Sequence, residues 1–537
     1  MNLPVTPVCI YITDEIETHR LLASTETGVW GTGDVSVCLE PSRNGGTAIK
    51  LSAPQKAVRR VRIVWPYEVP AGARILGDHF ERGYGDLEWR GIVPERILPW
   101  YALIYDPAQN STMAWGIETG ASAFCTWRVD GENMTLDLDV SCGGSGVQLK
   151  HRTLTAGIVH TYRTEPSETP FAAAHSFCRH LCPRPRLPRF PVYGANDWYY
   201  AYGNSSAEQI LRDTDLLVAH APDGPNRPFM VIDDGWQVGR GSSDWRETQR
   251  GPWDKGNARF PDMPGLAQTI RAKGARPGIW IRPLGAPPGT PENWLLPASR
   301  TNGATGGVPC LDPSLPENRE QIRTDIARLR EWGFELVKHD WTTCDALGRW
   351  GFEMHTGLTN SGWSFADNTR TSAEILRDLY EAIRDGAGTD DASALLIGCN
   401  TVGHLGAGLF EIQRTGDDTS GKDWERTRKM GVNTLAFRMP QHSTFFAADA
   451  DCVGLTNDVP WPLNRQWLDL LARSGTPLFV SADPNAVGPA QSAALREAFA
   501  CAALPQLPGE PLDWQNTTCP RQWRFGSEEH KYNWSSV

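Results

Sequence analysis

The sequence predicts an α/β protein: a (β/α)8 barrel of the TIM type, preceded by an N-terminal antiparallel β-sandwich and followed by a short C-terminal β segment. Apolar residues alternate with polar ones up to about residue 170, which is typical of antiparallel strands. After a proline-rich stretch, apolar strands alternate with amphipathic helices, which is typical of parallel β/α units. A barrel needs roughly 250–300 residues, so a chain of 537 residues has room for a further domain.

The predicted sandwich covers residues 1–170. Its alternating runs, such as 47–51, 60–65 and 134–140, are separated by Gly, Asn and Asp, residues that favour turns. A helix-like stretch at 171–181 and the prolines at 183, 185 and 188 then form a predicted linker over 171–190. The prolines therefore separate the sandwich from the predicted barrel.

The predicted barrel covers residues 191–505, and a β tail covers 506–537. Helices are expected between the strands, for example at 207–219, 320–332 and 372–383. Active sites of such barrels lie at the carboxyl ends of the strands. The eight expected strands lie near 192–198, 229–234, 278–282, 336–341, 394–400, 409–414, 433–437 and 477–481.

Composition narrows the class of protein. The 52 basic and 63 acidic residues give a net charge of −11, and no Lys/Arg tract is interleaved with aromatics, so nucleic acid is not an expected partner. No apolar run reaches about 18 residues, so we expect a protein that does not enter membranes. The first five residues lack the features of a secretory signal, so we expect a cytoplasmic protein, with a secreted protein whose leader has been removed as the alternative. A homo-oligomer remains open. The 22 tryptophans favour a carbohydrate ligand, because a flat indole with a polar N–H suits the faces of a sugar.

The twelve cysteines are scattered without paired CxxC spacing, so we interpret them as buried thiols. His175, Cys178, His180 and Cys182 fall on different faces of one predicted helix, which favours packing over a metal site. We predict no metal and no cofactor.

Acidic and basic side chains end several of the predicted strands. Asp340 ends the fourth, and strand alternation directs Lys338 to the same side, where its cation would keep the carboxylate ionised. Asp233 and Asp234 end the second, where they need donors around them. Retaining glycoside hydrolysis uses two carboxyl groups about 5–5.5 Å apart, and the sequence offers candidates on two strands. Taken alone, each segment also fits a purely structural role. Lys338 and Asp340 fit a buried ion pair, one of Asp233 and Asp234 fits a helix cap, and residues 414–418 fit a solvated turn.

Taken together, these segments resemble the α-galactosidase superfamily, glycoside hydrolase families 27 and 36. No single motif is decisive, but the order of the motifs along the strands is that of the family. The N-terminal sandwich favours the family 36 arrangement. The segments that carry the resemblance are Asn196-Asp197-Trp198, Asp233-Asp234-Gly235-Trp236, Lys338-x-Asp340, Arg414 followed four residues later by Asp418, and 477–483.

The resemblance implies a retaining α-galactosidase that takes small carbohydrate substrates. It implies that Asp340 is the nucleophile and Asp418 the acid/base, with Asp417 as the runner-up. It also implies that Asp233 and Asp234 bind O4 and O6 of galactose, that Lys338 reaches O3 and O4, and that Arg414 lies near O2. Candidates for an aromatic wall are Trp198, Trp236 and Trp280, and the loop expected to recognise position 2 of the sugar contains Cys399 and Asn400.

The sequence departs from the family at two places, which leaves the sugar less certain than the chemistry. Cys344 follows the nucleophile without the nearby partner that family 27 enzymes commonly use for a disulfide, and the loop at 399–404 matches neither common version. Alternatives are therefore an α-N-acetylgalactosaminidase, a β-L-arabinopyranosidase, a galactosyl transferase, or a galactose-binding pseudoenzyme. The loop at 78–89 is polar and aromatic, which fits either a contact with the barrel mouth or a plain sheet-edge loop.

Overall fold

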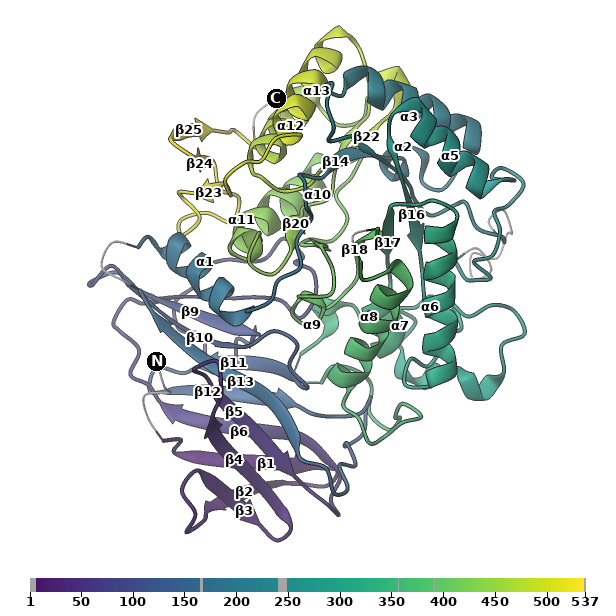
Figure 1. Ribbon diagram of the computed structural model, residues 1–537. Helices are drawn as coiled ribbons and strands as arrows, with labels where there is room; N and C mark the ends of the chain where they lie inside the picture. The colour runs from purple at the N-terminus through teal and green to yellow at the C-terminus, as the bar shows by residue number, and fades with distance from the viewer. Residues whose placement is uncertain (1–5, 165–167, 240–248, 356, 391, 536–537) are drawn as a thin grey trace.

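The computed structural model describes residues 6–164, 168–239, 249–355, 357–390 and 392–535. Figure 1 shows an antiparallel sheet built from the first third of the chain beside an α/β part built from the rest. This confirms the predicted α/β class with a β-rich N-terminal region. Within the described residues, no helix combines the length and the apolar character needed to cross a membrane.

The N-terminal sheet runs in the order β7-β9-β10-β13-β5-β4-β3-β2-β1-β6-β12-β11-β8. Its two halves pack on each other: Trp115 of β10 lies 5.9 Å, between ring centroids, from both Trp65 of β6 and Trp127 of β11. All three indoles are buried, so they form the centre of this core. The strands are β1 (Cys9–Asp14), β2 (Thr18–Ala23), β3 (Val29–Thr32), β4 (Val35–Pro41), β5 (Thr47–Ser52), β6 (Val58–Pro66), β7 (Arg74–Gly77), β8 (Leu98–Pro99), β9 (Tyr101–Asp106), β10 (Ser111–Ile117), β11 (Phe124–Val129), β12 (Asn133–Asp139) and β13 (Leu154–Arg163).

Helix α1 (Pro170–Leu181) follows the sheet and packs on β10. Thr169 caps it by accepting a hydrogen bond from the amide of Ala172, and Pro170 begins the first turn, where a missing N–H costs nothing. Its apolar face, which includes Phe177 and Leu181, is buried against the sheet.

The α/β part is built on a parallel sheet in the order β20-β19-β18-β17-β16-β15-β14-β22-β21. From β14 to β20 the spatial order is the chain order. The two strands at the ends of the sheet, β20 and β21, are separated in the chain only by residues 450 and 451. The strands are β14 (Tyr193–Asn196), β15 (Phe229–Ile232), β16 (Arg276–Ile281), β17 (Leu336–His339), β18 (Leu395–Gly398), β19 (Ile412–Arg414), β20 (Ala447–Asp449), β21 (Cys452–Leu455) and β22 (Leu478–Ala482).

Helices cover the outside of this sheet (Figure 1). The predicted helices are found at α3, α6 and α8, each within a few residues of its expected ends. The helices are α2 (Trp198–Ala201), α3 (Ala207–His220), α5 (Met263–Lys273), α6 (Pro316–Glu331), α7 (Thr342–Leu347), α8 (Ser372–Ala387), α9 (Gly403–Gly406), α10 (Trp424–Thr427), the π-helix η4 (Arg428–Asn433), α11 (Thr434–Arg438), α12 (Trp461–Arg473) and α13 (Pro489–Ala502). Short 3-10 turns are η1 (Glu292–Trp294), η2 (Ala298–Arg300), η3 (Gly351–Glu353), η5 (Met439–Gln441) and η6 (Pro484–Ala486).

The seventh strand was predicted in the wrong place. Residues 433–437 are helical, and the strand lies instead at β20 and β21. Leu435, Ala436 and Phe437 are all buried, and a short apolar run buried on every side does not reveal whether it is helix or strand. Arg438 is the last residue of α11, and His442 follows the 3-10 turn η5.

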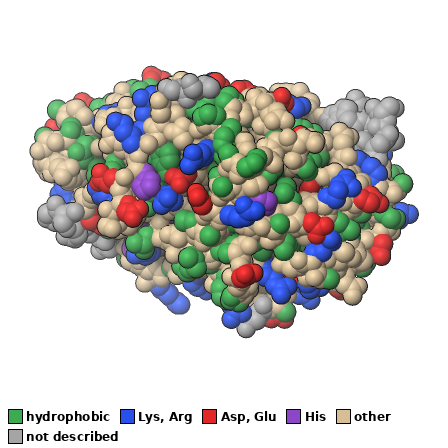
Figure 2. Space-filling model, turned by 90° about the horizontal axis from the view of Figure 1, so that it is seen from above, with side chains coloured by type: hydrophobic (Ala, Val, Ile, Leu, Met, Phe, Trp, Pro, Cys, Tyr) green, Lys and Arg blue, Asp and Glu red, His purple; other side chains and the backbone are tan. Residues whose placement is uncertain are grey.

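The tail forms a small antiparallel sheet of β23 (Glu510–Pro511), β24 (Gln522–Phe525) and β25 (Glu528–Lys531). Trp534 anchors it to the α/β part, because its carbonyl accepts a hydrogen bond from the Trp424 indole at 2.9 Å. All twelve cysteines lie in the described residues and are unpaired, most of them buried, as predicted. Figure 2 shows acidic and basic side chains interspersed over the face that it presents.

Candidate active site

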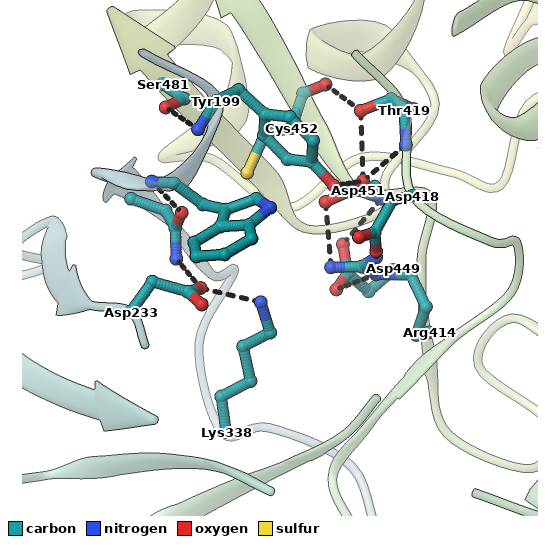
Figure 3. A network of polar contacts seen from close by, with 12 residues as sticks. Tyr199, Asp233, Lys338, Arg414, Asp418, Thr419, Asp449, Asp451, Cys452 and Ser481 are labelled. Atoms are coloured by element: carbon teal, nitrogen blue, oxygen red, sulfur yellow. Dashed lines mark hydrogen bonds and ion pairs between the residues drawn. The ribbon is translucent and has the colours of Figure 1, made fainter. Parts of the chain in front are cut away.

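The candidate site lies along the edge of the parallel sheet where the strands end. Strands β14 to β19 are parallel neighbours, so the residues that close them stand side by side. Figure 3 shows the Asp233–Lys338 pair on one side of this edge and the carboxylates around Arg414 on the other. The structure therefore brings together side chains from the first, second, fourth and sixth strands.

Asp233 is buried and fully engaged. One of its oxygens lies 2.6 Å from the Lys338 ammonium and accepts a hydrogen bond of 2.6 Å from the Asn196 amide. Its backbone amide donates to Asp197 at 2.7 Å. Burial acts to lower the pKa of Lys338, but the Asp233 carboxylate outweighs it and raises the pKa well above its ordinary value. The lysine is therefore a cation at all moderate pH values.

Asp234 is buried beside it. Its two oxygens accept hydrogen bonds from the side-chain amides of Gln237, at 2.6 Å, and Gln249, at 3.0 Å. Both adjacent carboxylates thus have donors around them, as the desolvation cost of two buried acids requires.

Asp340 is half-buried where β17 ends. The Trp280 indole donates to one carboxylate oxygen at 3.2 Å, and the Trp341 amide donates to the other at 2.7 Å. Trp341 holds the left-handed backbone conformation, with φ of 66°, which turns its amide back toward Asp340.

Arg414 ends β19 and is surrounded by acids. Its guanidinium meets Asp418 at 3.1 Å, Asp449 at 3.3 Å and Asp451 at 2.7 Å (Figure 3). The side chain is buried, and these three contacts hold its guanidinium in place. The contact with Asp418 fits a role in orienting that carboxylate, and the expected approach of Arg414 to O2 stays a prediction.

Asp418 and Asp417 are both partly exposed, and Asp418 is the more open, with 41% of its side chain accessible against 22%. Asp417 pairs with Arg82 at 3.2 Å and Arg426 at 2.8 Å. Partial burial raises the pKa of Asp418, but the cations of Arg414 and Arg82 outweigh it and lower the pKa below its ordinary value. A general acid needs a pKa high enough to keep its proton near neutral pH, so this direction is opposite to the one that the expected role of Asp418 requires.

Lys338 and Cys399 lie close to both halves of the site, because each interacts electrostatically with Asp340 and with Arg414. The charge of Lys338 acts on both Asp340 and Asp418. The Cys399 thiol is buried, and burial raises its pKa well above the ordinary value, although Arg414, Lys338 and Arg82 oppose this. The thiol is therefore neutral.

Two predicted binding residues do not face this edge. Trp236 is fully buried, and its indole donates to the carbonyl of Trp280 at 2.8 Å, so it packs in the core. Asn400 is also fully buried; its amide donates to Glu81, and its side-chain oxygen accepts from the amide of Cys344. Trp198 is half-buried next to Tyr202, with ring centroids 5.7 Å apart.

Two residues near Asp418 were not predicted as parts of the site. Asp451 lies in the break between β20 and β21 and accepts hydrogen bonds from Thr419 and Tyr199. Arg82 comes from the N-terminal part of the chain, where the polar loop at 78–89 was the available signal. In the described part of the chain, no three His, Cys, Asp or Glu side chains gather in a way that could hold a metal ion.

Several solved structures with a similar fold are α-galactosidases. The α-galactosidase TtGalA from Thermus thermophilus superposes with a TM-score of 0.61 and 18% identity, over 94% of this chain and 98% of that one. The family 36 α-galactosidase AgaA from Geobacillus stearothermophilus gives a TM-score of 0.61 at 14% identity, over 95% of this chain and 71% of that one. The galactosidase domain of the α-galactosidase-sucrose kinase AgaSK gives 0.56 at 15% identity, over 90% and 68%.

The chain has the fold of the family 36 α-galactosidases. At these identities, the likeness establishes the fold. Neither a protein-family model nor a curated protein sequence matches the chain. The expected resemblance is thus confirmed at the level of structure, and the chemistry of the site depends on the residues that this chain places there.

Proposed function

We propose that this chain hydrolyses terminal α-D-galactosides with retention of configuration, by double displacement on a (β/α)8 barrel preceded by a β-sandwich. The observation that carries the proposal is the pair of accessible carboxylates, Asp340 and Asp418, which follow the fourth and sixth strands and both interact with the Lys338 cation. TtGalA, which shares the fold, is an α-galactosidase seen in complex with p-nitrophenyl α-D-galactopyranoside.

In the first step, an oxygen of Asp340 attacks the anomeric carbon, and the bond from that carbon to the leaving oxygen breaks. Asp418 gives its proton to the leaving oxygen. In the second step, Asp418 takes a proton from water, and the water oxygen attacks the anomeric carbon and releases Asp340. The donors from Trp280 and Trp341 stabilise the Asp340 carboxylate before the attack and after its release.

Galactose differs from glucose by its axial O4. Asp233, Asp234 and Lys338 offer two acceptors and one donor next to each other, which suits the paired hydroxyls O4 and O6. We propose that these three residues bind the sugar and that no cofactor takes part.

The substrate is tested with a panel of nitrophenyl glycosides, following the anomer first released by NMR. We expect turnover of the α-D-galactoside with α-galactose as the first product. Good turnover of an α-N-acetylgalactosaminide or a β-L-arabinopyranoside without turnover of the α-galactoside would overturn the sugar assignment. Binding of galactose without any turnover would identify a pseudoenzyme.

The nucleophile is tested with Asp340→Ala. We expect turnover to be abolished while galactose still binds in calorimetry. Azide added to this variant can enter from the face that the carboxylate left, so any galactosyl azide formed must have the inverted configuration. A product of retained configuration would contradict the role of Asp340.

A further inference from the structure

The N-terminal sheet sends one segment across to the candidate site. Gly83 pairs with the loop after β19: its amide donates to the carbonyl of Thr415 at 2.7 Å, and its carbonyl accepts from the amide of Asp417 at 2.9 Å. This pairing lies directly before Asp418 and ties the loop to the N-terminal part of the chain.

The segment and the loop both pack so closely on η4 and α11 that each needs a glycine at the contact. A Cβ added to Gly83 would lie 2.8 Å from the Thr434 side chain, and one added to Gly416 would lie 2.2 Å from the Met430 carbonyl. Asn433 fastens the next turn of the segment, because it accepts from the amide of Leu87 at 3.2 Å and donates to its carbonyl at 2.8 Å.

Arg82 is the side chain that this docking delivers. It is 4% exposed, and its guanidinium lies 3.2 Å from Asp417 and 3.8 Å from Asp418. Its Cζ also lies 5.6 Å from the centre of the Trp350 ring, which in turn lies 4.9 Å from the ring of Trp341, the residue after Asp340. Arg82 therefore contacts the acid/base side directly and the nucleophile side through two indoles.

We propose that Arg82, supplied by the N-terminal sheet, is a positioning residue that holds the Asp417-Asp418 loop in place and sets the ionisation of Asp418. This inference rests on the proposed role of Asp418 as the acid/base. A cation close to the acid makes it give up its proton more readily to the leaving oxygen and leaves it ready to act as the base in the second step. The N-terminal part of the chain then contributes directly to the chemistry, because the α/β part alone lacks the Arg82 cation next to Asp418.

Several other groups also face Asp418, so the effect of Arg82 must be separated from theirs. Arg414 comes from β19 and Lys338 from β17, and both keep their places when Arg82 is changed. The charged and titratable groups acting on or next to Asp418 are Arg82, Arg414, Lys338, Arg426, Asp417, Tyr199 and Tyr202.

The test compares Arg82→Gln with the wild type and with Arg426→Gln. Arg426 is the matched control, because it also pairs with Asp417 but is 41% exposed and contacts Asp418 less directly. The readout is the pH at which kcat/KM falls on the basic side, measured on a galactoside with a poor leaving group. Removal of a cation within about 4–6 Å shifts the pKa of a carboxyl by roughly one unit or more. We expect Arg82→Gln to move the basic limb up by about one pH unit and Arg426→Gln to move it clearly less.

A uniform loss of activity at every pH, with the limb unmoved, would overturn the proposal, because it would show that Arg82 only maintains the fold. If Arg82→Gln does not fold, Arg82→Met serves instead, since a methionine keeps an unbranched stem beside Trp350 but carries no charge. An upward move of the basic limb in the folded Arg82→Met variant supports the proposal, and an unmoved limb contradicts it.

A second measurement does not depend on hydrolysis. The carboxyl carbon of Asp418, assigned with Asp418→Asn, is titrated by ¹³C NMR in the wild type and in Arg82→Gln. A higher midpoint in the variant supports the proposal even if no galactoside is turned over, in which case only the proposed function fails. Equal midpoints overturn it.

Discussion

The Lys338 ammonium lies 2.6 Å from the Asp233 carboxylate, and both side chains are buried where the fourth and second strands end. The pair joins two strands across the candidate site, and it places a fixed cation beside Asp340. A buried pair of this kind is costly to separate, because the partner left behind keeps its charge away from water.

Lys338→Met therefore lowers stability as well as sugar binding. Breaking a buried ion pair by removing one partner costs about 3–5 kcal/mol, and we expect a loss of this size in urea unfolding. The double variant Asp233→Asn with Lys338→Met recovers part of the stability, because no lone charge remains, but not the binding of galactose. A single variant that unfolds at the wild-type urea concentration would show that the pair is dispensable for folding.

Asp418→Ala distinguishes the acid from its neighbour. A general acid contributes about 10²- to 10⁴-fold to the rate when the leaving group needs a proton. We expect a loss in this range for a natural oligosaccharide and a smaller loss for an activated aryl galactoside. Asp417→Ala is the matched control and should affect both substrates equally. If Asp417→Ala instead shows the unequal losses, the acid is Asp417.

The sequence predicts the strand-end residues well, because the pattern that identifies them is local. Asp340 and Arg414 each follow an apolar run, and the ends of parallel strands share an edge whatever the loops do. Asp451 was harder to place, because it lies in the two-residue break between β20 and β21. In the sequence, this interrupted strand resembles a polar loop. Trp236 and Asn400 have suitable side chains near strand ends, but the sequence does not show which way they turn.

The contribution of the N-terminal sheet could not be predicted in detail. Leu87 and Asn433 are hydrogen-bonded although 346 residues separate them in the chain, and no period in the sequence indicates such a contact. The same docking explains the misplaced seventh strand. Residues 435–437 are apolar because they are buried in the packing around α11, not because they belong to the sheet.

Asp197 makes the protein less stable as the pH rises. Burial and the charge of Asp233 raise the pKa of Asp197 to about 7, above the ordinary 3.8. The folded state therefore holds a proton that the unfolded state has lost, and this stabilisation is present near pH 4 and disappears as the pH rises to about 7. At 1.36 kcal/mol per unit, the loss is at most about 4 kcal/mol.

Asp197→Asn removes this dependence. The asparagine oxygen still accepts from the amide of Asp233, and its amide group can donate to Ser205. We expect the stability of the variant, relative to the wild type, to increase between pH 4 and pH 8 in urea unfolding. A difference that stays constant over this range would show that Asp197 is already ionised in the folded protein.

His404 gives the opposite pH dependence, at the contact between the two parts of the chain. Its ring stacks on Trp100 of the N-terminal region, with centroids 4.7 Å apart, and its Nε2 lies 2.9 Å from the carbonyl of Ile117. Burial lowers the pKa of His404 to about 4, below the ordinary 6.5. The folded state excludes a proton that the unfolded histidine binds, so stability is complete above pH 6.5 and is lost as the pH falls toward 4. The loss is about 3 kcal/mol.

His404→Gln keeps a donor for the Ile117 carbonyl but cannot titrate. We expect it to be less stable than the wild type at pH 7.5, because the stacked ring is lost, and to approach the wild type as the pH is lowered to 4.5. Fluorescence of the buried tryptophans follows the transition in urea at each pH. The matched control is His19→Gln. His19 lies on β2 of the N-terminal sheet, is partly exposed, and pairs with Asp14 rather than with a residue of the α/β part. If both variants keep a constant difference from the wild type across this range, His404 does not carry the acid sensitivity of the interface.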